Sequence, residues 1–219
     1  MAVKIRYLGH SAFQVIGSKN ILIDPFLKGN STSKDVKGRP NMILVTHAHG
    51  DHMGDAVELS KKYEAPIICM YDIAQRISGV EVCGMNYGPA RIENVDIVMV
   101  PAWHSSSMDG VNVGNAAGFI VKMDGVTTYH AGDTFVFGDM ALFNEIYGPI
   151  DVALLPIGGY FTMGPKEAAK AVELLKPRVV VPMHYNTFPP IRQDPEEFKG
   201  LVGDRAEVRI LSPGDETEV

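Results

Sequence analysis

The segment 45–55, VTHAHGDHMGD, places three of the seven histidines and an aspartate within a stretch of six residues. Imidazole and carboxylate groups are ligands that divalent first-row metals bind well. Two histidines at i and i+2 in an extended loop can hold one ion, and the Asp–His pair that follows can turn toward a second. The composition would produce H-x-H-x-D-H in about one random chain in two thousand. The motif therefore favours a metal site over an ordinary polar loop.

Further ionisable side chains follow other predicted strands. His104 follows VDIVMVPAW, Asp133 follows VTTYHAG and His184 follows RVVVPM. Loops at strand ends commonly gather above a sheet, where binding sites are built. A single histidine in such a place is more often a hydrogen-bonded structural residue, and an aspartate can simply cap a turn. Together with the motif at 47–52, these residues support convergence on one site.

The elements that must position these side chains are many short strands with helices between them. Strands are expected at 3–8, 12–16, 21–24, 42–46, 66–70, 81–85, 95–102, 116–123, 126–130, 150–157, 178–184 and 206–211. Helices are expected at 54–63, 72–77, 139–147, 165–176 and 194–202. Helices occur in both halves and hairpins occur early, so two sheets between helical layers are favoured over one doubly wound sheet. No low-complexity linker divides the chain, which is expected to form one domain over residues 1–219.

The sequence resembles the metallo-β-lactamase-fold hydrolases through THAHGDH, AWH, AGDT and PMH, from the first hairpin to at least His184. LGHSAF, DPF, YHAGDT and FTMGPKEAA are similar to a group of small prokaryotic metal-dependent hydrolases. That group is related to the ascorbate-6-phosphate lactonase and to the N-acylphosphatidylethanolamine phospholipase D branch. The resemblance implies an α/β fold, a four-layer αββα sandwich of two mixed sheets. It also implies a hydrolase that uses a hydroxide bridging two divalent ions.

The resemblance further implies how the ligands divide between the two ions: His47, His49 and His104 hold one, Asp51, His52 and His184 hold the other, and Asp133 bridges them. Zinc is the expected metal, although manganese, iron or nickel suit the same ligands. Two cations about 3.5–4 Å apart can lower the pKa of shared water toward about 7. Asp133 would offset part of their charge, and Asp51 would orient the attacking hydroxide and later take its proton. Asp24, in ILIDP, matches an aspartate that orients the ligands from outside.

Two other histidines also lie near strand ends, His10 after the first strand and His130 three residues before Asp133. Either side chain could act in proton transfer, bind a substrate anion or only hydrogen-bond the backbone. His10 is expected to be the more involved in catalysis, and His130 to support the ligands from outside.

Substrate contacts are expected from Tyr160, in the loop 158–164, and from Asn186, which follows the last ligand. The glycines of this loop permit close backbone approach, and the helix that starts at Pro165 offers free N–H groups to an anion. Alternatively, Gly164 only caps that helix. The sequence leaves both interpretations of the loop open.

Composition disfavours several other classes. The 219 residues carry a net charge of −6 and contain no run of Lys or Arg, so no nucleic-acid partner is expected. No apolar stretch approaches the roughly 20 residues of a membrane span, and the N-terminus does not resemble a signal peptide. A cytoplasmic enzyme acting on a small molecule is expected, with self-association left open. Cys69 and Cys83 are expected to be reduced core residues rather than a disulfide or ligand pair.

The expected reaction is hydrolysis of an ester, lactone, amide or phosphodiester bond in a small molecule. One alternative is a diiron redox protein of the same fold, but such proteins typically have Glu at the position of His49 and carry an appended flavodoxin domain. Another is a non-catalytic metal-binding module, although a purely structural ion usually has a closed shell of four ligands.

Overall fold

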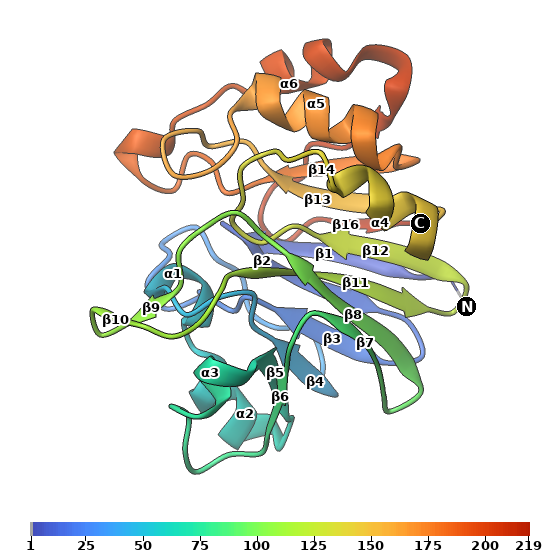
Figure 1. Ribbon diagram of the computed structural model, residues 1–219. Helices are drawn as coiled ribbons and strands as arrows, with labels where there is room; N and C mark the ends of the chain where they lie inside the picture. Colours follow the sequence, from blue (N-terminus) through green and yellow to red (C-terminus); the bar gives the residue numbers. More distant parts are fainter. Residues whose placement is uncertain (1) are drawn as a thin grey trace.

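Two seven-stranded sheets lie face to face in the computed structural model, which describes residues 2–219 (Figure 1). The first sheet consists, in spatial order, of β16 (Glu216–Glu218), β1 (Lys4–Gly9), β2 (Ala12–Ile16), β3 (Asn20–Ile23), β4 (Met42–Leu44), β5 (Ile67–Met70) and β6 (Val82–Met85). The second consists of β15 (Glu207–Val208), β14 (Val179–Met183), β13 (Val152–Pro156), β12 (Val126–His130), β11 (Ala117–Met123), β8 (Val95–Pro101) and β7 (Gly88–Ile92). A short hairpin of β9 (Ser107–Met108) and β10 (Val111–Asn112) projects from the loop after β8.

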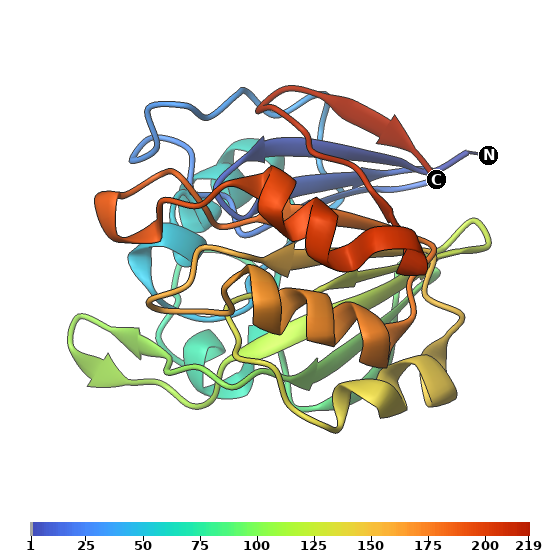
Figure 2. The same cartoon turned by 90° about the horizontal axis from the view of Figure 1, so that it is seen from above.

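Helices cover the outer face of each sheet (Figure 2). On the first sheet, α2 (Ala56–Tyr63) contacts β4 and β5, and α3 (Tyr71–Ala74) contacts β5 and β6. On the second, α5 (Pro165–Leu175) contacts β13 and lies between α4 (Met140–Tyr147) and α6 (Pro195–Val202). Two single turns of 3₁₀ helix, Pro189–Ile191 and Gly203–Arg205, flank α6. The predicted four-layer αββα sandwich of two mixed sheets is confirmed.

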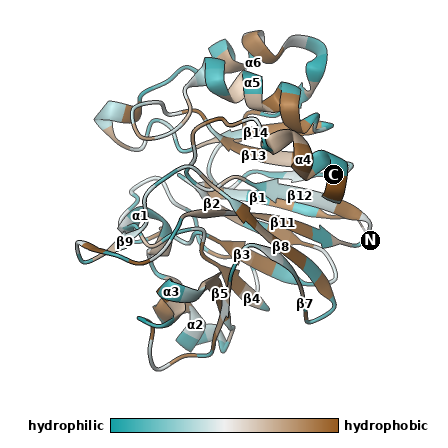
Figure 3. Ribbon diagram, viewed as in Figure 1, coloured by the Kyte–Doolittle hydropathy of each residue, from teal (hydrophilic) through white to brown (hydrophobic). Residues whose placement is uncertain are grey.

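The burial pattern explains why these segments form these elements. β13 and β14 are buried along their whole length, as expected for strands covered by a sheet on one face and helices on the other. Hydrophobic residues accordingly run along the strands of both sheets, whereas the outer helices alternate between hydrophobic and hydrophilic residues (Figure 3). In α5, Pro165 occupies the first turn, and the apolar residues Ala168, Val172 and Leu175 are buried.

The last part of the chain differs from the sequence-based prediction. The expected strand 206–211 forms only the two-residue β15, and an unexpected strand, β16, pairs antiparallel with β1. β16 reads ETE and was not detectable as a strand because it has no apolar alternation. β7, which begins Gly-Pro, was missed for a similar reason. The predicted helix 72–77 ends at Ala74.

Both cysteines are free thiols, with Cys69 buried and Cys83 half-buried on neighbouring strands of the first sheet. Among the described residues, 2–219, no helix is both long and apolar enough to cross a membrane.

Candidate metal centre

The strand topology brings six of the predicted site residues to one edge of the sandwich. β1, β3 and β4 run in the same direction within the first sheet, as do β8, β12 and β14 within the second. The residues that follow these six strands are His10, Asp24 and His47 in the first sheet, and His104, Asp133 and His184 in the second. The His184 N–H donates to the His10 carbonyl at 2.8 Å, which joins the ends of β14 and β1 across the two sheets.

One group of imidazoles consists of His47, His49 and His104, whose candidate donor atoms lie within 4.8 Å of one another. The Nε2 atom of His47 is 3.0 Å from the Nδ1 atom of His49. The backbone before α1 (Gly50–Met53) is extended at His49, so the two imidazoles can face the same point. The helix α1 was not predicted. It places Asp51 in a second group, and it places His52 both in that group and beside His47, whose ring centroid is 4.1 Å from that of His52.

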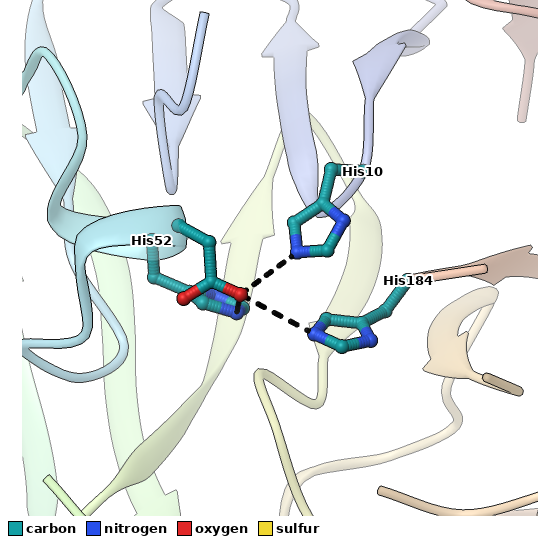
Figure 4. A group of neighbouring side chains, drawn as sticks. His10, His52 and His184 are labelled. Carbon is teal, nitrogen blue, oxygen red and sulfur yellow. Dashed lines mark hydrogen bonds and ion pairs between the residues drawn. The ribbon is translucent and has the colours of Figure 1, made fainter. Parts of the chain in front are cut away.

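The second group consists of His10, Asp51, His52 and His184, again with candidate donor atoms within 4.8 Å of one another. Figure 4 shows the three imidazoles directed at one carboxylate. This carboxylate belongs to Asp51, whose Oδ2 atom is 3.1 Å from His10 Nε2, 3.7 Å from His184 Nε2 and 3.8 Å from His52 Nε2. The sequence predicted three members of this group as ligands, and His10, which was expected to act in catalysis, lies beside them.

Asp133 lies between the two groups and is buried. Its Oδ1 atom is 3.2 Å from Nε2 of His52, which belongs to the second group. Its Oδ2 atom is 3.1 Å from His184 Nε2 and 3.6 Å from His104 Nε2, so the carboxylate faces both groups. This is the position that a bridging ligand requires.

The hydrogen-bond geometry of these atoms fits a metal centre better than a network of hydrogen bonds. His52 Nε2, Asp133 Oδ1 and both ring nitrogens of His184 are buried and make no well-aligned hydrogen bond among the described residues; His52 Nε2 and His184 Nε2 only approach the Asp133 carboxylate as ion pairs, at 3.2 and 3.1 Å. Leaving a buried polar atom unpaired costs about 1–3 kcal/mol, so several together need an explanation. A divalent ion accepts electron pairs from imidazole and carboxylate in this arrangement, and therefore the residues present fit such ions.

Asp24 and Thr46 hold two of the imidazoles in the tautomer that a metal requires. Asp24 is fully buried and accepts hydrogen bonds from the Thr46 N–H at 2.8 Å, the Thr46 hydroxyl at 2.7 Å and His52 Nδ1 at 2.8 Å. Because the Thr46 hydroxyl donates to Asp24, its oxygen accepts from His47 Nδ1, 3.1 Å away. Both rings thus carry a proton on Nδ1, which leaves Nε2 to face the centre. Asp24 has its predicted supporting position, whereas Thr46 was not singled out from the sequence.

His10 is connected to Asp51 on one side and to Thr187 on the other. Its Nδ1 atom is 3.0 Å from the Thr187 hydroxyl, and its Nε2 atom contacts Asp51. Burial lowers the pKa of His10 to about 4, so the ring is neutral near pH 7. A neutral ring that donates from Nε2 to Asp51 must accept from the Thr187 hydroxyl at Nδ1. Thr187 was missed because nothing in the local sequence marks it.

The ring nitrogens of His130, which was expected to support the ligands, hydrogen-bond to the backbone and to no ligand. Its Nε2 atom is 2.9 Å from the Ser11 carbonyl, and its Nδ1 atom accepts from the Gly132 N–H at 3.1 Å. The ring is buried and links β12 to the turn between β1 and β2. Both of its nitrogens are therefore used in holding the two sheets together beneath the site.

The charges of the centre are strongly coupled. Burial alone would raise the pKa of Asp133, but His184 and His52 hold it well below its usual range. Burial alone would lower the pKa of His184, but the Asp133 carboxylate raises it to about 9. The pKa of His52 is likewise held well above its usual range by Asp133 and Asp24. Protons on these imidazoles would be released when metal ions bind in their place.

A cavity of about 320 Å³ opens onto the centre and is lined by His49, Asp51, His104, Ser105, Asp133, Phe161 and His184. Tyr160 is not among these residues, and its side chain is 80% exposed. Asn186 lines a separate cavity of about 210 Å³ with Tyr7 and Thr187, and its Oδ1 atom accepts from the Gln193 N–H at 2.9 Å. Phe161, which contacts Tyr160 edge to face, lines the cavity at the centre, where the sequence analysis expected Tyr160.

The loop 158–164 acts as a cap for α5. The Gly164 N–H donates to the Glu167 carboxylate at 3.0 Å, so the helix N-terminus has a negative partner of its own. Of the two interpretations of this loop, the structure favours helix capping over the binding of an external anion.

Comparison with known proteins places the fold in a family. A model of the β-lactamase superfamily domain matches residues 4–184, and the chain belongs to this superfamily. It is 69% identical, over 99% of its own length and 100% of the relative's, to the UPF0173 metal-dependent hydrolase of Thermococcus kodakarensis. It therefore belongs to the UPF0173 family within that superfamily.

Several solved structures are similar to this one, among them Igni18 and CmlA. Igni18, a metallo hydrolase from Ignicoccus hospitalis, is 41% identical with a TM-score of 0.91, covering 100% of this chain and 99% of that one. CmlA, a diiron β-hydroxylase from Streptomyces venezuelae, has a TM-score of 0.77 at 13% identity, and the match covers 100% of this chain and 54% of CmlA. At that identity CmlA shows the shared fold alone.

Proposed function

We propose that this protein is a hydrolase that works with two divalent metal ions, zinc in the first instance. One ion is assigned to His47, His49 and His104, the other to Asp51, His52 and His184, with Asp133 shared. The observation that carries the proposal is the set of buried, unpaired imidazole and carboxylate atoms that face one another at the end of the two sheets. The names of the relatives, metal-dependent hydrolase and metallo hydrolase, support the same conclusion.

Bound divalent ions would lower the pKa of water toward neutrality and stabilise negative charge that develops on the substrate. The residues of the chain supply charge balance, proton transfer and the binding cavity. Asp133 balances positive charge between the two ligand groups, and Asp51 is assigned to orient the attacking water and later to take its proton. The cavity of about 320 Å³ suits a small molecule with an ester, lactone, amide or phosphodiester bond.

His10 is assigned the role of positioning Asp51. Its Nε2–H donates to Asp51 Oδ2 at 3.1 Å, and the same nitrogen cannot bind an ion while it carries that proton. Three surrounding rings, those of Phe26, Phe188 and His184, lie at centroid distances of 5.7, 5.3 and 4.2 Å and restrict its orientation. The role in catalysis expected for His10 is thus exerted through Asp51.

The test is hydrolysis of a panel that contains a lactone, a thioester, a phosphodiester and a phosphomonoester, with metal content measured on the same samples. Turnover by the purified protein should disappear with chelator and return with zinc or manganese. The variant His49→Ala should lose turnover and bind less metal while remaining folded, because His49 is only half-buried. Turnover that survives both this variant and chelation would refute the proposal. Oxygen consumption by an iron-loaded sample, without hydrolysis, would favour the diiron redox alternative instead.

A further inference from the structure

Three exposed aromatic residues lie on the loops that carry residues of the cavity at the metal centre: Phe161 lines the cavity, Trp103 precedes His104, and Phe135 follows Asp133 by two positions. We define this aromatic rim as Trp103, Phe135 and Phe161, whose side chains are 69%, 51% and 52% exposed. Large apolar side chains that gather on a surface commonly mark a binding site. Phe161 itself lines the cavity together with five of the proposed ligands, so the rim and the metal centre belong to the same space.

Hydrogen bonds connect the three loops that carry the rim. The Trp103 N–H donates to the Thr134 hydroxyl at 2.9 Å, and the Phe135 N–H donates to the Trp103 carbonyl at 3.2 Å. The Met163 N–H donates to the Thr134 carbonyl at 3.1 Å, which adds the loop that carries Phe161. Trp103 and Thr134 are also next in sequence to the proposed ligands His104 and Asp133. The backbone that carries the rim is therefore tied to the loops that carry the centre.

The same loops offer no positive charge to a substrate. The segments 102–116, 131–139 and 157–164 contain no Lys or Arg, and none of the residues that line the cavity is a Lys or Arg. At the N-terminus of α5, the Gly164 N–H is already paired with the Glu167 carboxylate. A substrate that carries a phosphate or carboxylate away from its scissile bond would therefore have no Lys or Arg partner on these loops. An uncharged apolar group could pack against Phe161.

We propose that the aromatic rim binds an uncharged acyl chain or aryl ring of the substrate while the scissile bond lies at the metal centre. This inference rests on the proposed hydrolase function and narrows it to apolar acyl or aryl esters, lactones or amides. In the hydrolysis of such an ester, water adds to the acyl carbon, the acyl–oxygen bond breaks, and a carboxylic acid and an alcohol are released. The position of Phe161 inside the cavity, rather than on a flat face, favours a small ligand over a second copy of the chain.

The experiment uses carboxylates that resemble the acyl product, titrated against the metal-loaded protein. Trp103 is the only tryptophan of the chain, so its intrinsic fluorescence reports ligands that reach the rim. Acetate, butyrate and hexanoate are compared, with glucose 6-phosphate and inorganic phosphate as charged probes. A fully buried methylene strengthens binding about fourfold, and a half-exposed rim should give about twofold per methylene. The dissociation constant should therefore fall about 16-fold from acetate to hexanoate, and glucose 6-phosphate should bind no more tightly than phosphate.

The variant Phe161→Ala should remove most of this dependence on chain length without changing the metal content. Ile146→Ala is the matched control, because Ile146 is 63% exposed on α4, at the opposite end of the sandwich (Figure 1). The proposal is overturned if hexanoate binds no better than acetate, or if Phe161→Ala keeps the full dependence. It is also overturned if sedimentation shows a dimer whose Trp103 fluorescence does not respond to any carboxylate.

These outcomes are separable from failure of the proposed function. The hydrolase proposal fails if turnover is insensitive to chelator or if the protein binds no metal. The rim proposal fails if the dissociation constant does not change with chain length in a protein that is metal-loaded and active.

Discussion

Replacement of Asp24 by Asn tests whether the centre depends on a carboxylate that touches no substrate. Asp24 receives three hydrogen bonds of 2.7–2.8 Å, two from Thr46 and one from His52, and is fully buried. Through these contacts it sets the tautomer of His52 directly and that of His47 through the Thr46 hydroxyl. The substitution Asp24→Asn keeps the size of the side chain but removes its charge and turns one acceptor into a donor.

Two effects of known size follow from this change. Loss of a residue that orients metal ligands typically weakens metal binding about 10-fold to 100-fold, which equals about 1.4–2.7 kcal/mol. In addition, one of the three donors around residue 24 must now face an amide N–H group, which should lower the free energy of unfolding by about 1–3 kcal/mol. Turnover at saturating metal should fall less than turnover at limiting metal, because the first effect is on affinity.

The measurement is zinc affinity by competition with a chromophoric chelator, together with thermal unfolding of the metal-free protein. Asp151→Asn is the matched control, since Asp151 also accepts a backbone N–H, from Thr127 at 2.8 Å, but lies before β13, away from the centre. If Asp24→Asn bound zinc as tightly as Asp151→Asn and the unchanged protein, the orienting role derived for Asp24 would be wrong.

Three further predictions concern variants of His10, the pH dependence of stability and the stabilisation by zinc. His10→Ala should lower kcat with little change in KM. His10→Gln should recover part of the lost kcat, because the glutamine amide can donate to Asp51. Equal kcat values for the two variants would contradict the positioning role. In the metal-free protein the pKa of His184 is about 9 and that of His10 about 4, against 6.5 for both in the unfolded chain. The contribution of His184 to stability is therefore lost as pH rises from about 6.5 to 9, and that of His10 as pH falls from about 6.5 to 4. Denaturant titrations should thus give maximal stability near pH 6.5, and a continuous rise toward pH 9 would contradict these assignments. Zinc at 100 times its dissociation constant should stabilise the fold by about 2.7 kcal/mol per site and raise Tm by about 5–11 °C, whereas an unchanged Tm would show that the native state binds no zinc.

Much of the centre could be predicted from sequence because its ligands carry their own local signal. The motif at 47–52 is compact, and His104, Asp133 and His184 each follow an apolar run that is easily recognised as a strand. Parallel strand directions then bring these ends together without any further information. The two-sheet architecture was predictable for the same reason, since buried strands and amphipathic helices have distinct periods.

The residues that the sequence did not reveal act through distant contacts. Thr187 contacts His10 across 177 positions of the chain, and Phe161 enters the cavity while its neighbour Tyr160 points outward. Threonine and phenylalanine are common in loops, so neither residue is distinctive before the fold is known. β16 was missed because pairing with β1, rather than hydrophobic alternation, defines it.

Backbone conformation at the strand ends accounts for one further feature of the centre that no pattern predicted. His10, Asp24 and His184 directly follow β1, β3 and β14, and all three have left-handed backbone conformations, with φ values of 57°, 46° and 53°. Such a conformation in a residue other than glycine costs of the order of 1–2 kcal/mol. At each of these strand ends the backbone leaves the extended conformation, and the side chain lies among the residues of the centre. The three residues include the orienting carboxylate, the positioning imidazole and a proposed ligand. Glycine would relieve the backbone strain at each position, but it would remove the imidazole or carboxylate from the centre. The fold is therefore less stable than it could be at the residues on which the proposed chemistry depends.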